Sequence, residues 1–250
     1  MKVWAYAICW NEIKMLPYYI KHYESFCEKI IIYDNESTDG SRRLIKEHPK
    51  CELRTYKTGN QIKDSKYLEI KNNCWQEARK IADYVIVGDM DEFIYHPNIL
   101  EFLKDNQEKY SLFKPAGFQM VSDSFPREPK PLTEIVKIGT HHGGSSKPII
   151  FCPTRLRAIN FRPGCHNADP KMKGKKWWFR DLGYSPEASP LKLLHYKFLS
   201  INYVVGRYNQ MSKRLSVENR KRGWGFHYRK PYHWINEEFK KWKKKATKII

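Results

Sequence analysis

Three carboxylates fall within four positions of the stretch YVIVGDMDEF at residues 84–93, where Asp89, Asp91 and Glu92 follow a run of apolar residues. Carboxylates this close repel one another, and burying them is unfavourable unless a cation or a hydrogen-bond donor compensates. Asp89 and Asp91 flank a single residue, so in an extended turn both can face the same side. Because Mg²⁺ and Mn²⁺ combine one or two carboxylates with water and phosphate oxygens, this spacing predicts a divalent-cation site that binds phosphate.

Two other interpretations fit the same residues. The aspartates could cap backbone N–H groups of a turn, with no ligand involved. Alternatively, Asp89 could be the nucleophile of a phosphatase-type motif. That motif usually ends the first strand of a domain and has a threonine soon after it, whereas here Glu92 and Phe93 follow a later strand.

Strand-like and helix-like segments alternate in the first 95 residues. Buried strands are predicted from apolar runs at 3–9, 29–34, 52–57 and 84–88, and helical spacing separates them at 13–27, 41–48 and 62–82. This alternation is typical of an α/β fold with a mostly parallel central sheet and helices on both faces. In the second half we expect a helix at 99–106, strands at 111–120, 133–139 and 148–153, and basic helices within 200–223 and 237–250.

Polar clusters follow three of the predicted strands. They are CWNE at 9–12, DNESTDGS at 34–41 and GDMDEF at 88–93. Because ligands of parallel α/β sheets bind beyond the carboxyl ends of the strands, we expect the three clusters to meet at one edge of the sheet.

The three clusters, in this order, resemble the nucleotide-sugar-binding half of a GT-A glycosyltransferase with a Rossmann-like sheet, family 2-like, of the short type with a DxDEF motif in bacterial and viral glycan assembly. The resemblance covers residues 3–95, with weaker similarity at HYKFLS (195–200) and RKRGW (220–224). It implies an enzyme that moves a sugar from a UDP-, GDP- or dTDP-sugar to a hydroxyl of a glycan or glycoconjugate, with Mn²⁺ or Mg²⁺ and with inversion. It also implies a catalytic domain at 1–200, divided into a nucleotide-sugar-binding half at 1–95 and an acceptor-side half at 96–200.

Residue roles follow from the same resemblance. The implied metal ligands are Asp89, Asp91 and His195. The implied nucleotide-sugar contacts are Asn11, Glu12, Asp34, Asn35, Asp89 and Met90. The candidates for the base that deprotonates the acceptor are Asp169 and His166 in PGCHNAD (163–169), followed by Asp181 in FRDLG. Glu92 is expected to orient its neighbours. The segment HHGGSSKP at 141–148 is predicted to be a mobile loop that closes over the donor.

Positive charge gathers in the last third of the chain. Residues 171–250 hold 21 Lys and Arg against 5 Asp and Glu, whereas residues 1–170 hold 25 against 22. We therefore expect residues 201–250 to form a basic helical extension packed on the catalytic domain. The apolar residues of EEFKKWKKKATKII at 237–250 lie among lysines, which predicts a peripheral contact with an anionic membrane or a phosphorylated glycan acceptor.

Other classes of function fit less of the sequence. A nucleic-acid-binding protein would use the basic aromatic region, but it would leave the acidic strand ends without a role, so nucleic acid is not an expected partner. A nucleotidyltransferase could use the same fold and metal. No stretch approaches the about 18 apolar residues of a membrane-spanning helix, the start lacks a signal-peptide pattern, and the six cysteines show no CxxC spacing, so we expect a cytoplasmic protein with free thiols.

Overall fold

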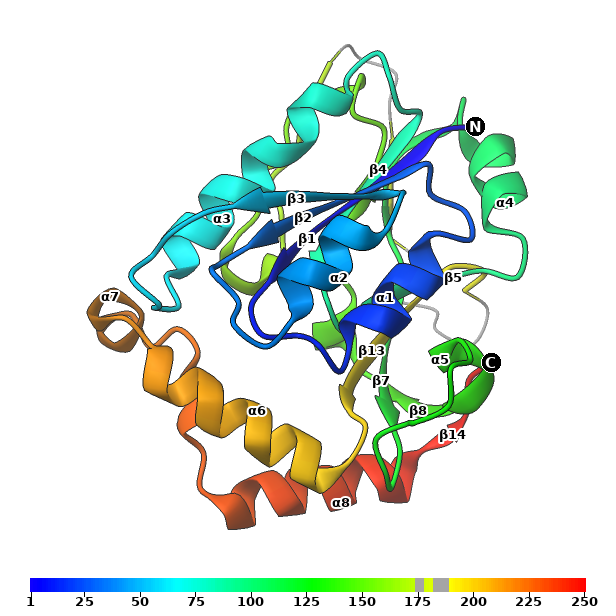
Figure 1. Cartoon of the computed structure of the whole chain (residues 1–250). Helices are drawn as coiled ribbons and strands as arrows, with labels where there is room; N and C mark the ends of the chain where they lie inside the picture. The colour runs from blue at the N-terminus through cyan, green and yellow to red at the C-terminus, as the bar shows by residue number, and fades with distance from the viewer. Residues whose placement is uncertain (174–177, 182–188) are drawn as a thin grey trace.

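The computed structural model describes residues 1–173 and 189–250, together with the backbone of residues 178–181 (Figure 1). Its larger sheet has seven strands in the order β12-β6-β9-β4-β1-β2-β3. The strands are β1 (Val3–Cys9), β2 (Lys29–Asp34), β3 (Cys51–Thr55), β4 (Tyr84–Asp89), β6 (Tyr110–Lys114), β9 (Ile150–Phe151) and β12 (Trp178–Asp181). Strands β3, β2, β1 and β4 are parallel, and β9 is antiparallel to both of its neighbours.

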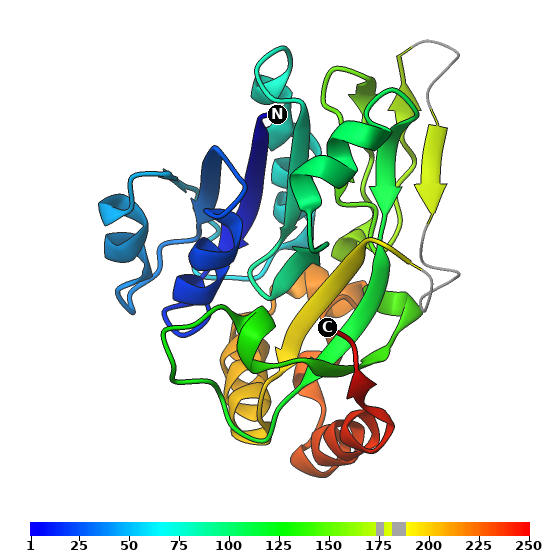
Figure 2. The same cartoon turned by 90° about the vertical axis from the view of Figure 1, so that its right-hand side faces the viewer.

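Helices cover both faces of the parallel strands. The helices are α1 (Leu16–Tyr23), α2 (Ser41–Glu47), α3 (Asp64–Asn73) with the 3₁₀ turn η1 (Cys74–Ala78), and α4 (Ile99–Asn106). Right-handed crossovers place α1 and α2 on one face and α3 on the other, because the chain reverses its direction across the sheet between β3 and β4 (Figures 1 and 2). Val85, Ile86 and Val87 of β4 are fully buried, as a strand covered on both faces requires. The predicted α/β fold class is confirmed.

A smaller sheet of five strands continues directly from the larger one. Its order is β14-β8-β7-β13-β5, with β5 (Glu92–Tyr95), β7 (Ala116–Val121), β8 (Ile138–His141), β13 (Lys192–Phe198) and β14 (Thr247–Lys248). The chain passes from β4 to β5 through Met90 and Asp91, and from β6 to β7 through Pro115. The segment DMDE is therefore one of the places where the two sheets join. A separate antiparallel pair is formed by β10 (Leu156–Ala158) and β11 (Lys171–Met172).

The C-terminal helices lie along one side of the molecule, where Figure 1 shows α6 above α8. They are α6 (Ile201–Arg214), α7 (Val217–Lys221) and α8 (Tyr232–Lys245), with the 3₁₀ turn η4 (Phe226–Arg229) before α8. They are held to β7 and β13 by a second hydrophobic cluster of buried residues, namely Val121, Phe198, Val204, Tyr208, Ile235 and Phe239. Among the described residues, no helix has the length and apolar character needed to cross a membrane.

Several predicted segments differ from the structure. The helix predicted within 237–250 begins earlier, at Tyr232, and ends before strand β14. The strand predicted at 111–120 is two strands in different sheets, because Pro115 lacks the N–H that would continue one ladder. The strand predicted at 133–139 begins as a helical turn, α5 (Leu132–Ile135), and only then enters β8. The helix predicted at 62–82 ends earlier, with η1 at Ala78, and Ile81 beyond it is 50% exposed.

Candidate active site

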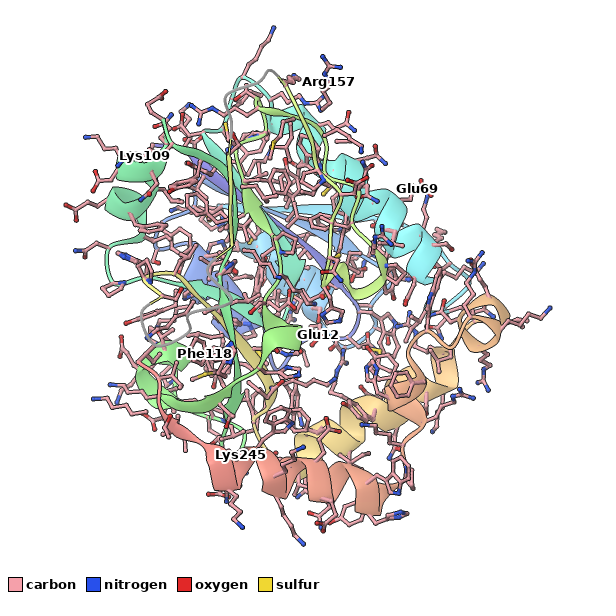
Figure 3. All side chains as sticks on the ribbon, turned by 180° about the vertical axis from the view of Figure 1, so that it is seen from behind. Glu12, Glu69, Lys109, Phe118, Arg157 and Lys245 are labelled. Atoms are coloured by element: carbon pink, nitrogen blue, oxygen red, sulfur yellow. The ribbon has the colours of Figure 1, made fainter. Side chains whose placement is uncertain are left out.

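A cavity of about 450 Å³ opens beyond the carboxyl ends of β1 and β4. These two strands are neighbours at the point where the strand order reverses, which is where α/β sheets bind their ligands. The walls come from the ends of β1 and β4, from α3, from the 3₁₀ turn η3 (Pro163–Cys165), from β13, and from α6 and η4. Figure 3 shows the labelled Glu12, one of the lining residues, near the centre of the molecule, while the labelled Lys109, Arg157 and Lys245 lie at its edges.

The carboxylate of Asp89 lies between two lysines. Lys71 Nζ of α3 is 2.5 Å from Asp89 Oδ1, and Lys147 Nζ is 3.4 Å from Asp89 Oδ2. Burial works to raise the pKa of Asp89, but Lys71 and Lys147 outweigh it and hold that pKa well below its usual value. Glu92 orients this group, as predicted, because its side chain accepts the backbone N–H of Asp89 at 3.1 Å and pairs with Lys147 at 2.5 Å.

Asp91 pairs with His195 across the smaller sheet. Asp91 Oδ2 lies 3.2 Å from His195 Nε2, because β13 runs antiparallel to β5 with His195 opposite Glu92. The other ring nitrogen, Nδ1, lies 3.4 Å from the hydroxyl of Ser145, which is also 2.9 Å from Nδ1 of His142. Burial works to raise the pKa of Asp91, yet His195 outweighs it and lowers that pKa.

The candidate ligand atoms suit a divalent cation only in part. Two adjacent ligand atoms, each about 2.1 Å from an octahedral ion, lie roughly 3 Å from each other. Asp91 Oδ2 and His195 Nε2 have about this separation. Both oxygens of Asp89 already face ammonium groups, so Asp89 does not fit as a free ligand in this arrangement. Within the described part of the chain, no three His, Cys, Asp or Glu side chains converge on a metal position. A cation held by Asp91 and His195 would therefore take its remaining ligands from water and from phosphate oxygens of a substrate.

Glu12, predicted to bind the nucleotide sugar, lines the cavity next to Arg207 of α6. The two side chains form a close ion pair, and the guanidinium also donates to the carbonyl of Asn11 at 2.8 Å. Burial raises the pKa of Glu12 to about 7, against the opposing effect of Arg207. Trp10 lines the same cavity with Arg214 stacked 3.5 Å from its ring centroid. The first polar cluster thus forms one wall of the cavity.

The second polar cluster mainly shapes the loop behind that wall. Asp34 is fully buried and accepts hydrogen bonds from Arg42 at 2.7 Å and from the backbone N–H of Ser37 at 3.0 Å. Asn35 is also fully buried and donates to Thr58 at 2.8 Å. Among the cavity-lining residues are the predicted contacts Glu12, Asp89 and Met90, but not Asn11, Asp34 or Asn35.

The candidate bases occupy different places. His166 lines the cavity, and its Nδ1 lies 2.5 Å from the carbonyl oxygen of Gly144, to which it donates, so that Nε2 is left as the acceptor. Asp169 pairs with Lys171 at 3.0 Å, where both side chains are 60% exposed, and it is absent from the cavity lining. The side chain of Asp181 lies outside the described residues.

Several cationic residues of the cavity were missed by the sequence analysis, namely Lys71, Lys147, Lys197 and Arg207. Burial lowers the pKa of Lys197 to about 8, and its ammonium lies 4.8 Å from the ring centroid of Tyr208. Two features of the sequence could have identified Lys71 and Lys197. Lys71 falls between Ile70 and Cys74 on the apolar side of a predicted helix, and Lys197 follows His195 in the weakly similar segment HYKFLS.

The 141–148 segment, predicted to be a mobile loop over the donor, is buried in its second half, whereas His141, Gly143 and Gly144 are exposed. Ser145, Ser146 and Lys147 are 3%, 2% and 5% exposed. The hydroxyl of Ser146 accepts the backbone N–H of Gly117 at 2.8 Å, and a Cβ on Gly117 would overlap the backbone of Ser145 and Ser146. This close approach seats Lys147 against Asp89 and Glu92, so the buried part of the segment helps to form the wall of the site.

Comparisons with known proteins yield structural similarity alone. No protein-family model matches this chain, and no curated protein matches it. A solved 4-diphosphocytidyl-2C-methyl-D-erythritol synthase is 11% identical, with a TM-score of 0.35 over 62% of this chain and 77% of that one. The enzyme of the same name from Anaerococcus prevotii DSM 20548 is 9% identical, with a TM-score of 0.34 over 61% and 71%. Similarity this low says nothing about activity, so the fold class rests on the sheet topology described above.

Proposed function

We propose that the protein is a glycosyltransferase that moves a sugar from a nucleoside-diphosphate sugar to an acceptor hydroxyl. The observation that carries the proposal is the composition of the cavity at the β1–β4 edge. Cationic side chains of α3, β13 and α6 converge there with the Asp91–His195 pair and a histidine whose Nε2 is an acceptor. A site that must bind a diphosphate and deprotonate a hydroxyl needs these groups.

The diphosphate is assigned to the cationic side of the cavity. Lys71 and Lys147 are in the deepest part, and Lys197 and Arg207 line the same cavity. Ammonium and guanidinium groups in a site with little water stabilise the negative charge that develops on the departing nucleoside diphosphate. Asp91 and His195 are the residues that would hold Mn²⁺ or Mg²⁺, which would add positive charge to the leaving group when bound.

Proton removal is assigned to His166. The acceptor oxygen attacks the anomeric carbon, the bond from that carbon to the diphosphate oxygen breaks, and the hydroxyl proton passes to Nε2 of His166. The hydrogen bond from Nδ1 to the Gly144 carbonyl selects the neutral tautomer with Nε2 as the acceptor and aims the ring. Burial and the nearby Lys147 lower the pKa of His166, which favours that neutral form. Attack opposite to the leaving group inverts the anomeric centre.

The test measures the nucleotide that is released. Purified protein with Mn²⁺ is given UDP-, GDP- and dTDP-sugars and a mixture of glycan acceptors, and free nucleoside diphosphate is quantified. One donor should yield its diphosphate in the wild type, and the Asp91→Ala variant should yield at least about 100-fold less. If the wild type releases no nucleoside diphosphate from any donor but binds nucleotides, the glycosyltransferase assignment is wrong.

A nucleotidyltransferase is the second candidate, and the two deep lysines favour it as well. A triphosphate places its β- and γ-phosphates where buried ammonium groups can stabilise a departing pyrophosphate, which is the same charge pattern. The distinguishing product is inorganic pyrophosphate. Incubation with nucleoside triphosphates and sugar 1-phosphates should release it if this candidate is correct and should release none if the protein is a glycosyltransferase.

A further inference from the structure

Two buried lysines share one accessible carboxylate at the base of the cavity. The side chains of Lys71 and Lys147 are 7% and 6% exposed, whereas that of Asp89 is 39% exposed. The ammonium groups therefore lie deeper than the carboxylate that neutralises them. Burial alone would lower the pKa of both lysines, but Asp89 outweighs burial at Lys71, and Glu92 with Asp89 outweighs it at Lys147. Both lysines stay charged.

The two carboxylates of this cluster are held in different ways. Glu92 is 1% exposed, pairs with Lys147 at 2.5 Å and also accepts the backbone N–H of Asp89, so it is fixed in the interior. Asp89 lies on the cavity side and is bound to the protein through its two ammonium partners. The cluster of two ammonium groups and two carboxylates is neutral as it stands, and Asp89 is the member that an incoming anion can replace.

We propose that Asp89 is an internal counter-anion of Lys71 and Lys147, and that a diphosphate takes its place when it binds. A buried ammonium group cannot be left unpaired without a large penalty, so the empty site needs an anion of its own. Phosphate oxygens form the same charge-assisted hydrogen bonds with ammonium groups as carboxylate oxygens do. The natural diphosphate would be that of a nucleoside-diphosphate sugar, so the inference rests on the proposed function for its substrate, though the lysine pair requires only phosphate chemistry.

This role reverses the expected effect of removing Asp89. If Asp89 helped to hold the ligand, its loss would weaken binding. As a counter-anion it competes for the lysines and repels the phosphate, so its loss strengthens anion binding in the absence of metal. Thermodynamic coupling of this kind commonly amounts to about 5- to 150-fold in affinity.

The experiment is isothermal titration of inorganic pyrophosphate into metal-free protein in the presence of a chelator. We expect Asp89→Asn to bind pyrophosphate at least about tenfold more tightly than the wild type, and the double variant Asp89→Asn/Lys71→Met to lose that gain. Matched controls are Asp123→Asn, whose side chain is 80% exposed and paired with Lys243, and Lys66→Met, which lies on the same helix as Lys71 and pairs with Glu69 at 2.6 Å. Both controls should bind as the wild type does.

Equal or weaker binding by Asp89→Asn overturns the proposal. If that variant does not fold, Asp89→Ser decides instead, because it also removes the carboxylate charge. Tenfold tighter pyrophosphate binding by Asp89→Ser supports the counter-anion role, and equal or weaker binding overturns it. The outcome is independent of sugar transfer: tighter pyrophosphate binding by Asp89→Asn without release of nucleoside diphosphate from any sugar donor would reject the proposed function and keep the counter-anion role.

Discussion

Asp91 Oδ2 lies 3.2 Å from His195 Nε2, so the turn after β4 is tied to β13 of the smaller sheet. Asp91 directly precedes β5 and His195 lies in β13, so the two side chains meet where these strands of the smaller sheet pair. Ser145, beside Nδ1 of His195, completes the contact from a third segment. This relationship places the two candidate metal ligands side by side.

Removal of either member of the pair should abolish the effect of Mn²⁺ on nucleotide binding. We expect Asp91→Asn and His195→Gln to lose at least about tenfold in Mn²⁺-dependent affinity for the nucleoside diphosphate, because one of two protein ligands is gone. Titration calorimetry with and without Mn²⁺ measures it, and Asp123→Asn serves as the control. Equal enhancement by Mn²⁺ in the wild type and in Asp91→Asn would place the cation elsewhere.

The stability of the protein should depend on pH through Glu12. Burial raises the pKa of Glu12 from 4.5 to about 7, Arg207 opposes the rise, and Asp91, Asp39 and Asp89 add to it. The unfolded state releases this proton at a lower pH than the folded state does. The free energy of unfolding therefore falls as the pH rises from about 4.5 to about 7, and below about 4.5 Glu12 causes no such loss.

Urea denaturation of the wild type and of Glu12→Gln checks this. The free energy of unfolding of the wild type, minus that of the variant, should fall by on the order of 2–3 kcal/mol between about pH 5 and about pH 8. Glu12→Gln also changes the contact with Arg207, so only the change of this difference with pH is diagnostic. A difference that is constant across this range contradicts a raised pKa.

The choice between His166 and Asp169 is a kinetic question. We expect His166→Ala to lower kcat by about 10²- to 10⁴-fold with little change in donor affinity, because a general base acts on the transition state. Steady-state kinetics with the sugar donor identified by nucleoside-diphosphate release gives both kcat and the KM for that donor. A comparable loss in Asp169→Asn, with His166→Ala active, would transfer the role to Asp169 and require that segment to move.

Gly117 should tolerate no side chain. A Cβ there overlaps the backbone of Ser145 and Ser146, so Gly117→Ala should lower the free energy of unfolding by at least about 2 kcal/mol. Gly206 is the matched control, because it lies in α6 with no atom within 4 Å of a Cβ position, and Gly206→Ala should raise stability by about 0.5–1 kcal/mol. Chemical denaturation of both variants provides the comparison, and a harmless Gly117→Ala would show that the 141–148 segment can shift.

In the C-terminal region, the exposed aromatic residues are not the ones predicted to contact a membrane. Phe239 is buried in the second hydrophobic cluster and Trp242 packs against it, so neither is free to enter a bilayer. Tyr232 and Trp234, at the start of α8, are 58% and 60% exposed, and Phe226 before them is 61% exposed. Exposed aromatic rings beside lysines are typical of protein surfaces at lipid headgroups.

We therefore expect the protein to sediment with vesicles of anionic lipid at low salt and to remain in solution with neutral ones. The double variant Tyr232→Ala/Trp234→Ala should lose most of this binding, while Val217→Ala, which removes an exposed aliphatic side chain of α7, should keep it. Retention of the double variant on anionic vesicles would leave only nonspecific attraction by charge. Salt-dependent binding to DNA by the wild type, with no vesicle binding, would favour a nucleic-acid partner.

The sequence predicts the parallel half of the fold well, since its strands are long apolar runs that end in polar clusters. Pro115 shows where prediction fails: the run at 111–120 is mostly apolar, and the strand pairing reveals that it changes sheets at the proline. Lys71 and Lys147 were not predicted as site residues for a different reason. The place of Lys71 between Ile70 and Cys74 is a local sign of burial, but the shared partner Asp89 lies 18 and 58 positions away in the chain from the two lysines, and no local pattern encodes that pairing.

The second hydrophobic cluster also has a dynamic consequence. It holds α6 and α8 to the sheets through six buried residues, apart from the main core that encloses β1 and β4. Units with their own small core open at a lower free energy than the global transition. Amide protons of α8 should therefore exchange with solvent sooner than those of β4. Since α6 and η4 form one side of the cavity, local opening of this unit would let a bulky sugar donor enter the cavity and the product leave it.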